Sequence, residues 1–289
     1  MNITLLYLVI TMSTKVIQPE ELRELLGREG LKVVEVDYDP STAYELGHIP
    51  GALLIDWKKD LNKYPERDII DPEGFEKLMS RLGISNDDLV VLYGDFNNWF
   101  AAFALWVFDL YGHENIKILN GGRNKWIELG YPMTKEVPSV SPSNYKISKV
   151  DLTKRATFID VMKRLRDPNV VLVDVRSPAE YKGEVTAPPE YPNEAAQRGG
   201  HIPGAINIPW AKAVNEDGTL KPLEDIKKLY EELGVTPDKD VIVYCRIGER
   251  AAFTYFVLHH LLGYKRIKVY DGSWSEWGNM VGAPIETEV

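Results

Sequence analysis

The sequence predicts an α/β protein made of two copies of one fold, each a small parallel sheet flanked by helices on both faces. Its length of 289 residues exceeds the usual size of a single domain. Short apolar segments typical of strands alternate with segments of helical periodicity along both halves, which favours parallel sheets covered by helices. One series of short motifs also occurs twice, in the same order.

The internal repeat is clearest in the hexapeptide Gly-His-Ile-Pro-Gly-Ala, which occupies residues 47–52 and again residues 200–205. An apolar segment ending in an aspartate precedes each copy, and a tryptophan follows each one. The other matched pairs are Asp37 with Asp174, Trp57 with Trp210, residues 89–93 with 240–244, and 120–122 with 271–273. Because order and separations agree, the halves are expected to share one fold.

The predicted strands are rich in β-branched residues and are nearly all apolar, as in parallel strands buried on both faces. Examples are Val170–Asp174, Val241–Tyr244 and Ile267–Tyr270. Helical periodicity appears at 73–82 and at 223–233, where Gly234 is a typical C-cap. The expected boundaries are a domain over 15–132, a linker over 133–156, rich in proline and serine, and a domain over 157–286.

Composition excludes several classes of function. The formal net charge of -9 argues against non-specific binding to nucleic acid or to an anionic membrane. A single cysteine excludes an internal disulfide, and the five histidines lack metal-ligand spacing, so no metal is expected. The apolar run 2–12 is too short to span a bilayer and lacks a basic leader, so we expect a non-structural start and a cytoplasmic protein.

The lone cysteine, Cys245, lies between a predicted buried strand and a helix expected from Ala251 to Leu262. Ligands bind at this carboxyl end of parallel strands, and a tight loop entering a helix directs backbone N–H groups toward one point. Gly248 permits such a loop, and Arg246 and Arg250 add positive charge. These surroundings predict a solvent-open thiolate with a pKa lowered to about 3.5–7.5.

Glu249 is the one residue of the loop that opposes this activation. A carboxylate pointing inward would raise the pKa of the thiol, so we expect it to face outward and to pair with a neighbouring cation. In the first half, Gly94 occupies the position of the cysteine. Only the second half is therefore expected to perform thiol chemistry.

These motifs resemble those of the rhodanese superfamily, specifically its two-domain thiosulfate sulfurtransferases, over about residues 15–286. The resemblance implies tandem rhodanese-like domains, of which the first is catalytically inactive. Cys245 would attack the sulfane sulfur of thiosulfate, release sulfite and hold a persulfide until cyanide, a small thiol or a protein thiol removes it. No metal or organic cofactor is implied.

The resemblance also implies the other residues of the site. Backbone N–H groups of the loop would hold negative charge. Aromatic side chains would close the pocket, although ordinary interdomain packing is an equal alternative for each of them. The implied substrate-binding residues are Arg246, Ile247, Gly248, Glu249, Arg250, Arg176, Trp99, Phe100 and Trp210. Glu180 stands where many animal enzymes have an arginine, and Arg176 or Arg198 are candidates to replace that ligand.

Three alternatives stay open. A 3-mercaptopyruvate sulfurtransferase would share the persulfide, but those enzymes usually have a glycine where this chain has Arg246, which favours thiosulfate as donor. A cysteine phosphatase would need five residues between cysteine and arginine, and four separate Cys245 from Arg250. A non-catalytic persulfide carrier is the third. His48 and His201 are expected to be structural.

Overall fold

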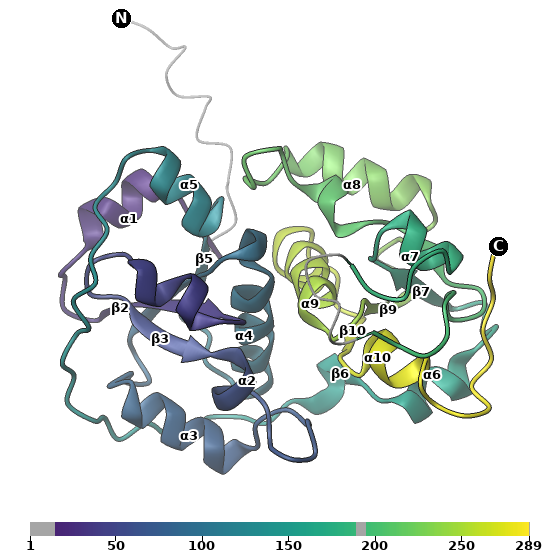
Figure 1. The fold of residues 1–289 in the computed structure, drawn as a ribbon, viewed down its shortest axis with the longest axis horizontal. Coiled ribbons are helices and arrows are strands. Elements are labelled where there is room, and N and C mark those ends of the chain that lie inside the picture. Colours follow the sequence, from purple (N-terminus) through teal and green to yellow (C-terminus); the bar gives the residue numbers. More distant parts are fainter. Residues whose placement is uncertain (1–14, 189–194, 289) are drawn as a thin grey trace, which may run out of the picture.

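Two lobes of matching architecture make up the computed structural model, which describes residues 15–188 and 195–288 (Figure 1). Each lobe contains a five-stranded parallel sheet with helices packed around it. In order across the sheet, the first consists of β1 Val16–Ile17, β5 Ile116–Leu119, β4 Leu89–Tyr93, β2 Leu31–Asp37 and β3 Leu53–Asp56. The second consists of β6 Arg155–Ala156, β10 Ile267–Tyr270, β9 Asp240–Tyr244, β7 Val170–Asp174 and β8 Ile206–Asn207. The two orders are equivalent, which confirms the predicted fold.

The helices of the first lobe are α1 Pro19–Leu25, α2 Trp57–Asp60, α3 Pro72–Arg81, α4 Trp99–Leu110 and α5 Gly122–Glu128. Those of the second are α6 Phe158–Arg164, α7 Pro178–Lys182, α8 Leu223–Glu232, α9 Glu249–Tyr255 and α10 Ser273–Trp277. A π-helix, Phe256–Leu261, continues α9. Short 3-10 turns lie at Pro40–Thr42, Tyr44–Leu46, Phe96–Asn98, Leu152–Lys154 and Trp210–Ala213.

Helix α4 is apolar apart from Asp109, and every one of its residues is buried. A helix of this kind must be covered all around. One side of α4 contacts its own sheet, and another packs against α9 of the second lobe, so that the two helices face each other in the middle of the molecule (Figure 1). One hydrophobic cluster therefore runs through both domains, which fixes the loop before α9 against the first domain.

Helix α9 begins at Glu249, two residues earlier than predicted, which places Glu249 and Arg250 in its first turn. Arg155–Ala156, placed in the linker by the sequence, forms the edge strand β6 and pairs with β10. Two residues in a parallel ladder leave no periodic pattern to detect. The apolar run 2–12 lies outside the described residues.

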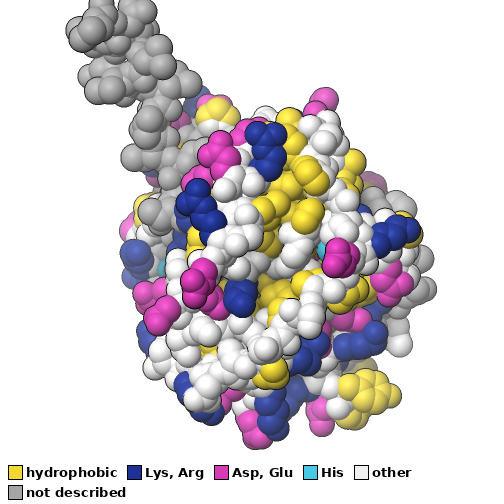
Figure 2. All heavy atoms as spheres, turned by 90° about the vertical axis from the view of Figure 1, so that its left-hand side faces the viewer, with side chains coloured by type: hydrophobic (Ala, Val, Ile, Leu, Met, Phe, Trp, Pro, Cys, Tyr) yellow, Lys and Arg dark blue, Asp and Glu magenta, His cyan; other side chains and the backbone are white. Residues whose placement is uncertain are grey.

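The outer face of the first domain mixes acidic, basic and apolar side chains (Figure 2). Among residues 15–188 and 195–288, every helix is too short or too polar to cross a bilayer.

Candidate active site

Cys245 follows β9, which lies between β7 and β10, and its side chain is fully buried. Its backbone is held at both ends by the start of α10. The Cys245 N–H donates to Ser273 Oγ at 3.0 Å, and the Trp274 N–H donates to the Cys245 carbonyl at 3.0 Å. Ser273 adopts a φ of 50°, uncommon for a residue with a side chain, and this turns its hydroxyl toward Cys245.

The loop after Cys245 turns backbone N–H groups toward the sulfur. The Gly248 N–H donates to Cys245 Sγ at 3.2 Å, and the Ala251 N–H also favours the charged form of the sulfur. Gly248 has a φ of 98°, and a Cβ there would lie 3.0 Å from the Cα of Asp271. Glycine is therefore required both by backbone conformation and by space.

Glu249 points inward, which corrects the expectation that it faces solvent. Cys245 Sγ donates to Glu249 Oε2 at 3.1 Å, and the Ile247 N–H approaches the same oxygen at 3.3 Å. The helix begins at Glu249, so the side chain folds back over the loop instead of pointing away from it. Its other oxygen lies 3.4 Å from Arg250 Nε and 3.8 Å from Arg246 Nη2, so it does pair with cations as expected.

These surroundings also correct the predicted state of the thiol. Burial, followed by the negative charge of Glu249, raises the pKa of Cys245 to about 11, against the lowering effect of Arg250. The resting group is a protonated, enclosed thiol and not a solvent-open thiolate. The sequence shows the arginines that favour the thiolate. It does not show how deeply Cys245 is buried, and burial favours the neutral thiol.

Arg250 is engaged by Glu180 in a buried two-pronged ion pair. Its Nη1 and Nη2 lie 2.8 and 3.0 Å from the two carboxylate oxygens, and both side chains are almost fully buried. Ser177 and Glu180 form a capping box at the start of α7, which holds the carboxylate in place. Burial alone would raise the pKa of Glu180, but the charge of Arg250 outweighs it and brings the pKa down to about 2.

The remaining arginines are bound to protein groups. Arg246, one of the implied substrate-binding residues, is fully buried beside Glu249. Arg176 pairs with Asp174 at 2.6 Å and donates to the Gly200 carbonyl at 2.7 Å. Arg198 donates to four backbone carbonyls. Arg198 is half-buried and Arg176 fully buried, and Arg176 Nη1 is the one nitrogen of that guanidinium without a hydrogen-bond partner among the described residues.

A cavity of about 590 Å³ opens beside this ion pair, at the boundary of the two domains. Its lining residues are Phe96, Asn97, Trp99, Ser177, Pro178, Ala179, Glu180, Val185, Pro188, Pro209, Trp210, Ala211 and Arg250. Trp99 and Trp210 meet edge to face with ring centres 4.9 Å apart. The cavity combines apolar walls with one charged pair. Of residues 245–250 only Arg250 lines it, and Cys245 does not.

Phe100, expected at this position, is instead buried against Tyr38 and Trp57 and does not line the cavity. Phe96 takes its place. Residues 96–98 all have positive φ, a backbone conformation that apolar side chains seldom adopt and that the sequence did not reveal.

Gly94 explains why the first domain has no thiol at the equivalent position. A Cβ on Gly94 would lie 2.3 Å from the Val36 carbonyl oxygen, so no side chain fits there. The surroundings are also acidic in composition, since Glu35 and Asp37 are buried and Asp95 is half-buried, with Arg123 paired to Glu35. Burial raises the pKa of all three carboxyl groups, that of Asp37 to about 8.

The histidines of the repeated hexapeptide are structural, as expected. His48 stacks on Tyr44 and His201 stacks on Tyr181, with ring centres 3.7 and 3.6 Å apart. In each pair the histidine Nδ1 also contacts the backbone carbonyl of its stacking partner.

One group among the described residues has the composition of a metal site, namely Asp109, His259 and His260. These residues bind protein groups instead. His260 Nε2 lies 2.5 Å from Asp109 Oδ2, which also accepts from the Tyr255 hydroxyl, and His259 contacts the Tyr264 carbonyl. The network joins α4 to the π-helix and so belongs to the contact between domains.

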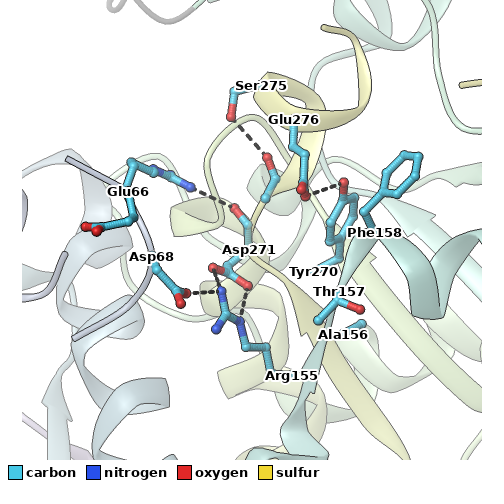
Figure 3. Close-up of a pocket in the computed structure, with 12 residues that line it drawn as sticks. Glu66, Asp68, Arg155, Ala156, Thr157, Phe158, Tyr270, Asp271, Ser275 and Glu276 are labelled. Carbon is cyan, nitrogen blue, oxygen red and sulfur yellow. Dashed lines mark hydrogen bonds and ion pairs between the residues drawn. The ribbon is translucent and has the colours of Figure 1, made fainter. Parts of the chain in front are cut away.

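A second cavity, of about 510 Å³, lies where a loop of the first domain meets the second domain (Figure 3). Arg155 is one of its lining residues. It binds both carboxylate oxygens of Asp271 at 2.7 and 2.9 Å and also Asp68 of the first domain at 2.7 Å. Cys245 does not line this cavity, but Asp271 is two residues from Ser273, which holds the Cys245 backbone.

Comparison with known proteins places both halves of the chain in one family. The model of the Rhodanese-like domain matches residues 18–129 and 157–280. The chain is 54% identical over 267 residues to the sulfur carrier protein TtuD of Thermus thermophilus, covering 91% of this chain and 93% of that protein. It is 53% identical over 261 residues to a Saccharopolyspora erythraea protein named "Putative thiosulfate sulfurtransferase", covering 90% and 92%. A Haloferax volcanii protein of the same name is 49% identical over 255 residues, covering 88% of each chain.

Two solved structures of related proteins superpose on most of this chain. A variant of EanB with a cysteine persulfide and ergothioneine superposes with a TM-score of 0.85 at 26% identity, covering 96% of this chain and 71% of that one. The anaerobic ergothioneine biosynthesis enzyme from Chlorobium limicola, in complex with trimethyl histidine, gives a TM-score of 0.83 at 27% identity, with 96% and 71% covered.

Proposed function

Because this chain belongs to the rhodanese family of sulfurtransferases, we propose that Cys245 takes the outer sulfur of thiosulfate and passes it on as a persulfide. The acceptor is cyanide, a small thiol or a protein thiol. A lone cysteine stays available for this chemistry in a reducing compartment, which favours the cytoplasm.

The observation that carries the proposal is the contact between the Gly248 N–H and Cys245 Sγ at 3.2 Å. A persulfide carries its charge on a sulfur atom one bond beyond Sγ. Amide donors directed at this region stabilise that charge, in the manner of an oxyanion hole. The proposed approach for the donor and acceptor is the aromatic cavity beside Arg250, although Cys245 itself does not line it.

The proposed reaction has two steps. The Cys245 thiol first gives its proton to Glu249 Oε2, which already accepts its hydrogen bond at 3.1 Å. The thiolate then attacks the outer sulfur of thiosulfate. The new S–S bond forms as the S–S bond of thiosulfate breaks, and sulfite leaves with the bonding electron pair. In the second step the acceptor attacks the terminal sulfur and the Cys245 thiolate departs. Splitting the transfer in this way gives ping-pong kinetics, and no step requires a metal or organic cofactor.

Thiosulfate is preferred over 3-mercaptopyruvate because a cation in the loop suits a small dianion, and Arg246 follows the cysteine here. Arg246 is buried beside Glu249, so it acts on the loop's charge and not as a surface ligand. We expect Arg246→Gly to lower kcat/KM for thiosulfate more than for mercaptopyruvate. Equal loss with the two donors would contradict this preference.

A second candidate is a persulfide carrier that exchanges sulfur with partner proteins. It is favoured by the name of the Thermus thermophilus relative and by the enclosed, protonated thiol. A carrier would load one sulfur atom per chain and discharge it only to its partner, without steady-state turnover of cyanide.

The decisive experiment is mass spectrometry of the intact protein after treatment with thiosulfate. We expect a gain of one sulfur atom on the peptide that contains Cys245, and no gain in Cys245→Ser. Cys245 is the only cysteine, so no other thiol competes. If the wild-type protein gains no sulfur, the proposal fails. Steady-state formation of thiocyanate from cyanide then separates the enzyme from the carrier.

A further inference from the structure

The carbonyl groups of residues 245–248 each accept a hydrogen bond. Three of the donors come from the second domain itself: Trp274 N to Cys245 O, Ser275 N to Arg246 O and Ala252 N to Gly248 O, at 2.8–3.0 Å. The fourth donor comes from the first domain. Arg67 Nη2 donates to the Ile247 carbonyl at 2.8 Å, across 180 residues of sequence.

The Ile247 carbonyl belongs to the same peptide group as the Gly248 N–H. In a planar trans peptide these two bonds point in opposite directions, so a donor that fixes the carbonyl also fixes the direction of the N–H. That N–H is the one that contacts Cys245 Sγ at 3.2 Å. Arg67, the 247–248 peptide and the sulfur therefore form a continuous hydrogen-bonded chain, in which each bond polarises the next.

We propose that Arg67 of the first domain is a positioning residue for the thiol chemistry of Cys245, acting through the 247–248 peptide group. The inference rests on the proposed role of Cys245 as the sulfur-carrying group. It gives the catalytically inactive domain a direct part in the reaction, beyond its contribution to the walls of the aromatic cavity. An arginine suits this role because hydrogen bonds from a charged donor are stronger than those between neutral groups.

The local backbone supports a specific function for Arg67. It has a φ of 56°, a conformation that is unfavourable for a residue with a side chain and that persists only where surrounding contacts hold it. Two backbone hydrogen bonds of 2.7 Å hold the turn, from Arg67 N to Lys63 O and from Lys63 N to Asp68 O. The guanidinium carbon lies 5.5 Å from the centre of the Trp57 ring, and this contact restricts the conformations open to the Arg67 side chain.

The adjacent residue, Asp68, provides a matched control. It also crosses to the second domain, where it binds Arg155, which in turn holds Asp271 (Figure 3). This contact joins the same loop to the same domain but does not reach the 247–248 peptide. A residue that only docks the domains should behave like Asp68, whereas a positioning residue should affect the sulfur.

The test is the rate at which iodoacetamide alkylates Cys245, measured from about pH 7 to pH 9. The charged groups near the sulfur are Glu249, Arg246 and Arg250 on its own loop and helix, Glu180 on α7, and Arg67 from the first domain. In Arg67→Ala we expect the rate to fall about tenfold across this range, which corresponds to a rise of about one unit in the thiol pKa. Asp68→Ala should stay within about twofold of wild type, and Arg67→Lys should recover part of the loss.

Several results would overturn the inference. An unchanged rate in Arg67→Ala would mean that the peptide keeps its direction without Arg67. A faster rate would mean that Arg67 only closes the loop over the sulfur. An equal loss in Asp68→Ala would reduce Arg67 to a docking contact. Thermal unfolding of both variants checks that each is folded at the assay temperature.

Alkylation requires no sulfur donor, so the inference and the proposed function can fail separately. If wild-type protein gains no sulfur from thiosulfate while Arg67→Ala still slows alkylation, the donor assignment fails and the positioning role stands. If wild type loads sulfur and Arg67→Ala loads it at the same rate, the positioning role fails alone.

Discussion

Replacing Glu180 by glutamine removes the negative charge of the buried pair with Arg250 while keeping the size and shape of the side chain. Arg250 would then be a buried cation without its main partner. Breaking such a pair from one side costs about 3–5 kcal/mol. The pKa of Glu180 gives a similar magnitude, because a drop from 4.5 to about 2 corresponds to about 3 kcal/mol.

The assay is the thermal unfolding midpoint at pH 7. A loss of about 3 kcal/mol predicts a midpoint lower by about 5–10 °C for a chain of this size. The matched control is Glu232→Gln, which removes the same charge from an exposed pair with Lys228 in the same domain, and it should leave the midpoint nearly unchanged.

The pH dependence provides a second check of the same pair. Because the pKa of Glu180 is lowered in the folded protein, its stabilisation is present above the unfolded value of 4.5 and is lost as the pH falls toward about 2. The difference between wild type and Glu180→Gln should therefore narrow from about pH 5 downward. A midpoint difference below about 2 °C at pH 7, or one that is as large at pH 3, would refute the reasoning.

Three further variants test the charges and the packing around the two equivalent loops. Glu249→Gln should lower the pKa of the Cys245 thiol from about 11, because the Glu249 charge is the second largest cause of the raised pKa, after burial. The pH profile of alkylation should then shift to lower pH. An unshifted profile would contradict this. Asp37→Asn should raise the thermal midpoint more at pH 9 than at pH 5. Its folded pKa is raised to about 8, so its stabilisation is present below the unfolded value of 3.8 and lost as the pH rises through 8, and an equal effect at both pH values would count against it. Gly94→Ala should destabilise the protein by at least about 2 kcal/mol, because its Cβ would lie 2.3 Å from the Val36 carbonyl oxygen. Unfolding in urea measures this loss. A variant as stable as wild type would show that the backbone moves to make room for the methyl group.

The sequence by itself determined the duplicated α/β fold and the location of the thiol. The presence of parallel strands alternating with helices follows from apolar segments that recur with the same spacing in both halves, because such periodicity is a local property of the chain. The order of the strands within each sheet came from the structure. Cys245 was placed at the carboxyl end of β9 by the same means, because a buried strand, a short glycine-containing loop and a helix follow one another directly. The edge strand β6 was missed, since two residues carry no period.

Only the tertiary structure decided the chemistry around the sulfur. Glu249 faces inward, Arg250 pairs with Glu180 at a distance of 70 residues in sequence, and Arg67 reaches the loop from the other domain. Phe96 lines the cavity where Phe100 was expected. The direction of a charged side chain depends on how deeply it is buried and on which partner is within reach, and both are set by contacts between residues distant in the chain.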